Sequence, residues 1–229
     1  MTTTPAPTRP YAPIRPARTR RGPVGTPTTP GAAQPAAAGQ AVRTARVPLE
    51  HRRTLVVRLA EAWSRRRYGA VLEPGLVALH NRRVLTTMVR TESSAARWNT
   101  LDPTLRALAT LAAAAQIGCS WCLDFGYWQS RSEGVPAEKL AAVPSWRTAA
   151  PDVLTERERA VLAYAEAMTA TPPTVDDAMV AGLHRWLDDA QVVELTALVA
   201  LENSRSRTNA AMGLTGQGFR DRCDLADRP

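Results

Sequence analysis

Apolar side chains beyond residue 50 recur at the three- and four-residue spacing of a helix. The first such segment is predicted to be an amphipathic helix ended by Gly69, with one apolar face made of Leu55, Val56, Leu59, Ala60 and Trp63. A second helix is predicted from Leu76 to about Arg90. A third should follow Asp102-Pro103, an N-cap with proline at the first helical position, and stop at Gly118.

The second half of the chain carries further helix signals. Helices are predicted from Cys119 to about Ser132, through a short turn at residues 137–143, and from Thr155, which has capping-box spacing to Glu158, as far as Pro172-Pro173. Thr174 should cap a helix that runs through Trp186, and Asp188 or Asp189 should cap a last one from Val192 to about Met212. Because no segment alternates apolar and polar residues as a strand does, the predicted fold class is all-α.

Composition separates a tail from this helical region. Residues 1–49 hold 10 Pro, 10 Ala, 9 Thr and 7 Arg with no acidic residue, so they cannot bury enough apolar surface to fold and are predicted to be disordered. Residues 50–220 are predicted to form one all-α domain, and residues 221–229 a flexible C-terminal tail. The formal charge of +8 comes from the front of the chain, because residues 1–70 hold 13 Arg against two Glu.

The same counts limit the function classes. No stretch has the roughly 18 uncharged apolar residues of a membrane-spanning helix, and residues 1–49 lack the continuous apolar region of a secretory signal. Three cysteines are too few and too clustered for a secreted disulfide scaffold, so we expect a cytoplasmic protein without a membrane partner. The arginine-rich tail leaves contact with nucleic acid as an alternative to a solvated tail, although most of the chain is slightly acidic.

The sequence Cys119-Ser120-Trp121-Cys122 carries the sharpest chemical signal. Two thiols three positions apart at a helix start can close a small disulfide ring, and the free N–H groups and dipole of that helix end stabilise a thiolate. A c-type haem site is excluded because Leu123 stands where histidine is needed. A zinc site lacks further ligands, since Cys223 and the three histidines have no paired spacing near the motif. Burial of both cysteines as small hydrophobic residues stays open.

Other residues near the motif and in the last helix allow two interpretations. The aromatic residues Trp121, Phe125, Tyr127 and Trp128 could form an apolar substrate pocket or pack in the core. In the last helix the polar series Glu202, Asn203, Arg205, Arg207 and Asn209 could be a paired network or the point where the helix enters water. Cys223 could be a distant resolving thiol or a free surface cysteine.

Several stretches resemble one known family. The helix that Leu101-Asp102-Pro103 opens and Gln116-Ile117-Gly118 ends, followed by the Cys-x-x-Cys motif, is similar to the carboxymuconolactone decarboxylase and alkylhydroperoxidase D superfamily. Residues 163–173 and 193–213 resemble its actinobacterial members, and the likeness covers roughly residues 45–220. The resemblance implies an alkylhydroperoxidase D-like helical bundle that assembles as trimers or hexamers, with a dithiol that reduces hydroperoxides in the peroxidase members.

The resemblance also implies roles for individual residues. In the peroxidase members the second cysteine attacks the peroxide and the first resolves it, which would give attack to Cys122 and resolution to Cys119. The family's proton-relay Glu and His fall on Ala107 and Gly126, so both relay groups are absent here. A positioned general base is typically worth about 10² to 10⁴ in rate, and without one peroxide reduction would depend on a thiolate stabilised by the helix terminus alone. The candidate substitutes for the relay are Asp124, Tyr127 and Glu202, although Glu202 requires the last helix to pack across the motif; each could instead be solvated or structurally paired.

The sequence therefore supports two hypotheses about function. The first is a cytoplasmic thiol oxidoreductase that cycles Cys119 and Cys122 between dithiol and disulfide, with no metal or bound cofactor, and with a thiol or protein reductant as electron donor. Its substrate would be a small hydroperoxide, with Trp121, Phe125 and Trp128 lining the pocket. The second is a catalytically silent, decarboxylase-like oligomeric member of the fold that binds a ligand or partner.

Overall fold

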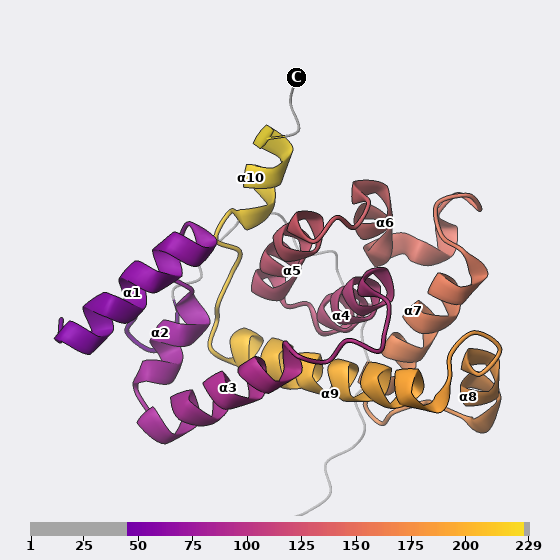
Figure 1. The fold of residues 1–229 in the computed structure, drawn as a ribbon, viewed down its shortest axis with the longest axis horizontal. Helices are drawn as coiled ribbons and strands as arrows, with labels where there is room; N and C mark the ends of the chain where they lie inside the picture. The colour runs from indigo at the N-terminus through magenta and orange to yellow at the C-terminus, as the bar shows by residue number, and fades with distance from the viewer. Residues whose placement is uncertain (1–44, 227–229) are drawn as a thin grey trace, which may run out of the picture. The chain divides into compact units, whose positions relative to one another are not determined.

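The computed structural model describes residues 45–226, which form α-helices and one 3-10 helix and contain no strand. The prediction of a disordered tail falls mainly on residues 1–44, which lie outside the described residues. The helices, shown in Figure 1, are α1 (Leu55–Tyr68), α2 (Glu73–Leu79), α3 (Arg82–Ala95), α4 (Pro103–Ile117), α5 (Ser120–Ser132), α6 (Ala137–Ala142), η1 (Val143–Thr148), α7 (Glu156–Thr169), α8 (Asp177–Leu183), α9 (Asp189–Ala211) and α10 (Phe219–Ala226). The predicted all-α fold class is confirmed.

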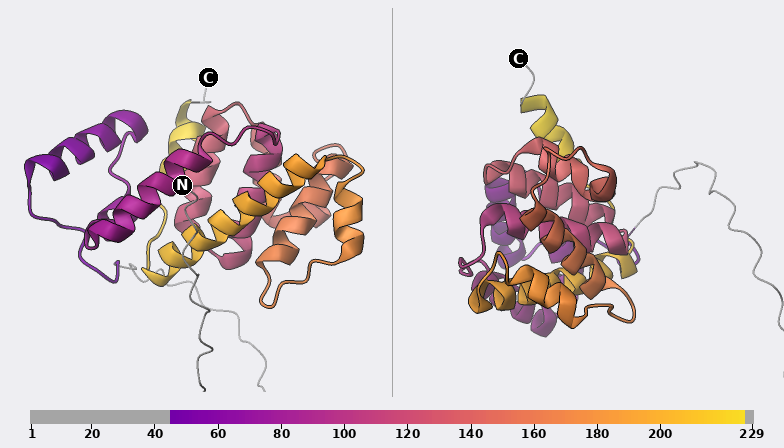
Figure 2. Two further views of the ribbon diagram at one scale, coloured as in Figure 1. Left: turned by 60° about the horizontal axis from the view of Figure 1, so that its bottom comes forward. Right: turned by 90° about the vertical axis from the view of Figure 1, so that its right-hand side faces the viewer.

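Helix α4 lies at the centre of the core and contacts α5, α7 and α9 (Figures 1 and 2). Its Leu and Ala side chains are buried on most sides, and Leu108 is fully inaccessible to solvent. Both predicted ends are confirmed, because Asp102 accepts hydrogen bonds from two backbone N–H groups and Gly118 adopts a left-handed conformation with φ of 77°. This C-cap turns the chain directly into α5, so the stop of α4 also positions the two cysteines.

The helix predicted at 76–90 is two helices. Pro74 opens α2 in its first turn, and α2 stops at Leu79. Asn81 then starts α3, where its side-chain oxygen accepts hydrogen bonds from the backbone N–H groups of Arg83 and Val84. An N-cap of this kind can interrupt an apolar pattern that looks continuous, which is why periodicity alone joined the two segments.

Two further predictions near the C-terminus are corrected by the structure. Asp176 rather than Thr174 caps α8, which ends at Leu183 before the predicted Trp186. The segment expected to be a flexible tail from residue 221 continues α10 as far as Ala226. The predicted capping box of Thr155 with Glu158 is confirmed, as is Asp188 as the cap of α9, where it forms a further capping box with Gln191.

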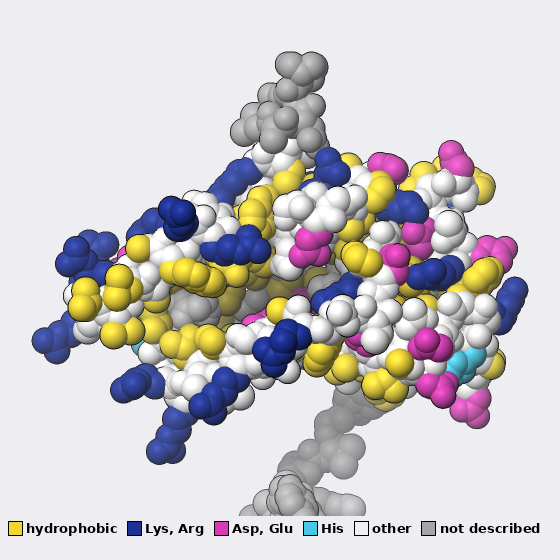
Figure 3. All heavy atoms as spheres, viewed as in Figure 1, with side chains coloured by type: hydrophobic (Ala, Val, Ile, Leu, Met, Phe, Trp, Pro, Cys, Tyr) yellow, Lys and Arg dark blue, Asp and Glu magenta, His cyan; other side chains and the backbone are white. Residues whose placement is uncertain are grey.

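The apolar face of α1 is exposed, and its opposite face contacts the rest of the chain. Leu55, Val56, Leu59 and Trp63 are 61 to 74% exposed. The buried Ser64 instead donates a hydrogen bond to the carbonyl oxygen of Ala70. Figure 3 shows hydrophobic side chains interspersed with basic ones over this end of the described chain. A patch of this kind marks an interaction surface in most soluble proteins.

Residues 45–49 precede α1 and are already in contact with the folded chain. The backbone N–H of Arg46 donates to the carbonyl oxygen of Met212 at 2.8 Å, and Leu49 packs against the apolar cluster around the cysteines. The folded region therefore begins about five residues before the predicted domain start at residue 50. Among the helices of residues 45–226, none combines the length and apolar character needed to cross a bilayer.

Candidate dithiol site

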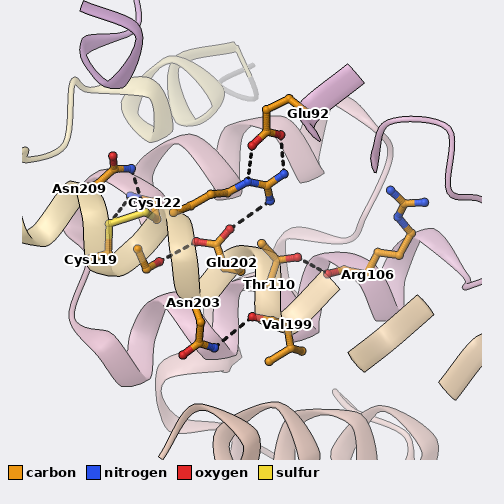
Figure 4. A network of polar contacts seen from close by, with 11 residues as sticks. Glu92, Arg106, Thr110, Cys119, Cys122, Val199, Glu202, Asn203 and Asn209 are labelled. Atoms are coloured by element: carbon orange, nitrogen blue, oxygen red, sulfur yellow. Dashed lines mark hydrogen bonds and ion pairs between the residues drawn. A yellow bond between two sulfur atoms is a disulfide. The ribbon is translucent and has the colours of Figure 1, made fainter. Parts of the chain in front are cut away.

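Cys119 and Cys122 form a disulfide at the start of α5 (Figure 4). Cys119 is the N-cap of this helix, and its sulfur accepts a hydrogen bond from the backbone N–H of Cys122 at 3.2 Å. The two Cα atoms are 5.3 Å apart, within the ordinary range for a disulfide. The predicted geometry is therefore present, with both sulfur atoms at the positive end of one helix dipole.

The disulfide lies in an apolar cluster of its own. Cys119 is 1% and Cys122 7% exposed, and they share this cluster with Ala114, Trp121 and Leu214. The side chains packed against it include some from α2 and from the segment before α1, namely Leu72, Val77 and Leu49. A reagent in solution would therefore reach Cys122 more easily than Cys119.

Helix α9 packs across α5 and places a polar side chain on the disulfide. The side-chain amide nitrogen of Asn209 donates a hydrogen bond to the sulfur of Cys122 at 3.4 Å (Figure 4). Asn209 is itself 5% exposed, so this donor is fixed in a dry environment. From the sequence alone Asn209 belongs to the polar series of the last helix and has no predicted role in the site. Asn209 lies seven residues after Glu202, a spacing that puts both side chains on one face of a helix. This spacing is the feature of the sequence that could have linked Asn209 to Glu202.

Glu202 is buried on that face of α9 and forms a paired polar network (Figure 4). One of its carboxylate oxygens accepts a 2.6 Å hydrogen bond from the hydroxyl of Ser206, and the other accepts one from Arg205 at 3.3 Å. Arg205 also pairs with Glu92 of α3, at 2.8 Å through Nε and 2.5 Å through Nη2. Of the two interpretations of this polar series, the structure supports the paired network.

Burial dominates the electrostatics of Glu202. Desolvation raises the pKa of its carboxyl above the usual value, and the nearby Arg205 and the hydrogen bond from Ser206 only partly oppose this effect. The raised pKa favours the protonated form of this buried carboxyl group.

The other two relay candidates have different surroundings. The carboxylate of Asp124 accepts hydrogen bonds from the backbone N–H groups of Gln217, Phe219 and Arg220, at 2.7 to 3.1 Å, and so caps the start of α10. Tyr127 is buried in the main core, where the guanidinium group of Arg220 lies 4.4 Å from its ring centroid. Of the three candidates, Glu202 is the one on the face of α9 that also contacts Cys122.

The predicted pocket residues pack against one another. Trp121 and Phe125 are stacked with ring centroids 5.0 Å apart, and Trp128 lies 5.5 Å from Phe125. Phe219 of α10 packs edge-on against Phe125 at 5.2 Å, and the indole N–H of Trp121 donates to Gln217. These contacts favour core packing, the second interpretation of the cluster, and they join α5 to the C-terminal segment.

The two positions where the family's relay groups fall carry no polar side chain and lie against the core. Ala107 is 7% exposed. A Cβ atom on Gly126 would lie 3.0 Å from a methyl carbon of Leu111. The side chain of Leu111 therefore occupies the space into which a histidine at position 126 would extend. Within residues 45–226 no group of three His, Cys, Asp or Glu side chains is arranged to hold a metal ion.

Fold and site together define a helical protein with a Cys-x-x-Cys pair at the start of a helix. The model of the carboxymuconolactone decarboxylase family matches residues 82–167. The chain is also 38% identical over 119 residues to the uncharacterized protein YnjA of Escherichia coli (strain K12). That alignment covers 52% of this chain and 64% of YnjA, so the chain spans less than two thirds of its relative's length.

Solved structures share the fold at low sequence identity. An uncharacterized peroxidase-related protein from Silicibacter sp. TM1040 matches with a TM-score of 0.69, 15% identity and coverage of 80% of this chain and 98% of its own. The alkylhydroperoxidase AhpD core protein of Ralstonia eutropha JMP134 matches at 0.66 and 16%, with coverages of 77% and 94%. The debrominase Bmp8 with 2,3,4-tribromopyrrole matches at 0.65 and 18%, with coverages of 82% and 98%. The chain is therefore similar to the carboxymuconolactone decarboxylase family over residues 82–167, and it shares its fold with these solved structures.

Proposed function

We propose that this protein is a thiol oxidoreductase that reduces hydroperoxides with Cys119 and Cys122. The Cys122 thiolate attacks the terminal oxygen of the hydroperoxide, the O–O bond breaks, and the alcohol leaves after taking a proton. Cys122 is then a sulfenic acid. The Cys119 thiol attacks that sulfur, so that an S–S bond forms and the hydroxyl group leaves as water. An external thiol or protein dithiol reduces the disulfide and is itself oxidised.

The observation that carries this proposal is the hydrogen bond from Asn209 to the sulfur of Cys122. Each sulfur accepts one hydrogen bond, Cys119 from the backbone N–H of Cys122 at 3.2 Å and Cys122 from the amide group of Asn209 at 3.4 Å. The Asn209 donor favours negative charge on Cys122, and it supports Cys122 as the attacking residue together with the greater exposure of that sulfur. The helix dipole acts on both cysteines and cannot make this distinction.

Glu202 is assigned the proton relay that Ala107 and Gly126 cannot supply. It would take the proton of the Cys122 thiol and return it to the departing alkoxide. Ser206 lies one helical turn from both Glu202 and Asn209, is fully buried, and donates its hydroxyl hydrogen to Glu202. That hydroxyl would carry the proton between the sulfur and the carboxylate. Asp124 is left out of the relay because its carboxylate is engaged in capping α10.

A second candidate function rests on the burial of both sulfurs. Cys119 is almost inaccessible, and apolar side chains from α2 and the segment before α1 pack against the cluster. A disulfide closed in this way could serve stability alone, in a module that binds a ligand or partner without catalysis. The enzymatic function requires instead that a substrate reach the sulfur of Cys122, which is 7% exposed.

Single-turnover measurements on three reduced proteins test the proposal. The wild type should convert one equivalent of an alkyl hydroperoxide to the alcohol and end as the disulfide. Cys119→Ser should also produce the alcohol but stop at a sulfenic acid, which dimedone labels on Cys122. Cys122→Ser should produce no alcohol above the rate of a free thiol, and Cys223→Ser serves as the control that should match the wild type. Equal turnover in Cys122→Ser, or none in the wild type, would favour the silent module.

We propose further that the protein self-associates and acts in a reducing compartment. The exposed apolar face of α1 supports self-association, because a second copy would remove Leu55, Leu59 and Trp63 from water. The family resemblance implies a trimer or hexamer. Light scattering coupled to size exclusion should give an oligomer for the wild type and a smaller species for a variant with serine at these three positions; a monomeric wild type would contradict the proposal.

A further inference from the structure

Arg205 bridges two carboxylates that differ in burial. Glu202 on its own helix has a side chain that is 4% exposed, whereas Glu92 on α3 is 47% exposed. Glu92 receives two of the guanidinium hydrogen bonds, at 2.8 and 2.5 Å, and Glu202 receives one at 3.3 Å. The guanidinium group of Arg205 therefore interacts more strongly with Glu92, which lies farther from the buried site, than with Glu202.

We propose that Arg205 and Glu92 are positioning residues that set how readily Glu202 takes up a proton, and with it the pH range in which the dithiol works. This inference rests on the relay role proposed for Glu202. Arg205 favours the anionic carboxylate, and Glu92 limits that effect because it holds the guanidinium group toward α3. Arg205 thus opposes the effect of burial on the Glu202 carboxyl group, and Glu92 weakens that opposition.

Several other charged groups on the neighbouring helices have partners of their own. On α4, which packs along α9, Arg106 pairs with Glu194 more than two turns before Glu202. On α5, Asp124 caps α10. On α7, Glu158 pairs with Lys139, and Glu166 with Arg147. Among the residues that the structure describes, Arg205 and Glu92 are the charged groups whose interaction with Glu202 shifts its titration.

Removing either partner should move the titration of Glu202 in opposite directions. Without Arg205 the buried carboxylate loses its counter-ion, so Arg205→Gln should move the titration to higher pH. Without the carboxylate of Glu92 the guanidinium group is left with Glu202 alone and a repulsive charge is removed, so Glu92→Gln should move it to lower pH. An opposite charge at this distance typically shifts a carboxyl titration by about one to three pH units. If Arg205 and Glu92 had only a structural role, the two substitutions would not shift the titration of Glu202 in opposite directions.

Two readouts on the full-length protein test this inference. The first is the ¹³C chemical shift of the Glu202 carboxyl carbon against pH, with its signal assigned by comparison with Glu202→Gln. The second is the pH profile of single-turnover reaction with an alkyl hydroperoxide, whose acidic limb should move with the carboxyl titration. Arg205→Lys keeps the charge and should restore most of the wild-type profile. Glu61→Gln is the matched control, because it breaks an ion pair with Arg65 on α1, away from the site.

The outcomes separate this inference from the proposed function. Shifts of at least half a pH unit in opposite directions for Arg205→Gln and Glu92→Gln support the network, even if no hydroperoxide reacts and the proposed function fails. Shifts in one direction, or coincident titrations in all variants, overturn it. If Arg205→Gln does not fold, the test uses Arg205→Lys and Glu92→Gln. A Glu202 titration that does not move to lower pH in Glu92→Gln then overturns the inference.

Discussion

Replacement of Asn209 by Ala tests whether its amide group supports a thiolate at Cys122. In the oxidised protein the amide nitrogen lies 3.4 Å from the sulfur of Cys122, and the side chain is 5% exposed. After reduction the same donor should face a thiol or thiolate. Since the amide hydrogen bonds more strongly to the anion than to the neutral thiol, its loss should make the thiolate harder to form.

The size of this effect follows from the geometry. A hydrogen bond to a charged group contributes about 1.5 to 3 kcal/mol, and the long distance to sulfur places this one near the lower limit. Because 1.36 kcal/mol corresponds to one pH unit in a titration, Asn209→Ala should move the midpoint of Cys122 alkylation upward by about one unit. At a pH below both midpoints the alkylation rate should then fall about tenfold.

The assay is the rate of iodoacetamide reaction with the reduced protein between pH 5 and pH 10, followed on the Cys122 peptide by mass spectrometry. Asn203→Ala is the matched control, since Asn203 lies on the same helix but donates to Thr169 and to the carbonyl oxygen of Val199. The control should keep the wild-type midpoint. Midpoints that coincide for Asn209→Ala and the wild type would refute the reasoning that assigns attack to Cys122.

Three further substitutions probe the structure around the site. Asp124→Ala removes the acceptor of three backbone N–H groups and should lower the free energy of unfolding in urea by about 1 to 3 kcal/mol. Amide exchange at Phe219 should become faster, and unchanged exchange would contradict the role of Asp124 as a cap. Gly126→Ala gains up to about 1 kcal/mol of helix propensity in α5, and contact of its Cβ with Leu111 at 3.0 Å opposes this gain. The substitution should therefore be more favourable in a Leu111→Ala background than in the wild type, and a double-mutant cycle without coupling would contradict this. The pKa of Glu202 is raised in the folded protein, so ionisation of this carboxyl group opposes folding above about pH 4.5. The free energy of unfolding of Glu202→Gln should therefore increase relative to that of the wild type as pH rises. A difference that stays constant between pH 4 and pH 8 would contradict this.

Helix ends were predictable where the signal is local. Asp102-Pro103 and Gly118 fix the ends of α4 by hydrogen bonds and backbone conformation within a few residues, and the structure confirms both. The same holds for the capping box of Thr155 with Glu158. The Cys-x-x-Cys spacing belongs to this local class, because three residues at a helix start suffice to bring two sulfurs together.

Contacts between distant segments were not predictable from local pattern. The contact between Asn209 and Cys122 joins residues 87 positions apart, and it depends on the packing of α9 across α5. The pairing of Arg205 with Glu92 spans 113 positions. Periodicity also identified the apolar face of α1 but could not show that this face is exposed. Patterns of this kind specify which residues share a face and not which element covers it.

The most direct test of the central claim is a count of thiols and alcohol after one turnover. Reduced protein is mixed with one equivalent of an alkyl hydroperoxide, the remaining thiols are titrated, and the alcohol is quantified by chromatography. The account predicts one alcohol for every two thiols lost, with a disulfide between Cys119 and Cys122 in the peptide map. Full recovery of thiols without alcohol would contradict it and leave the disulfide a structural bond.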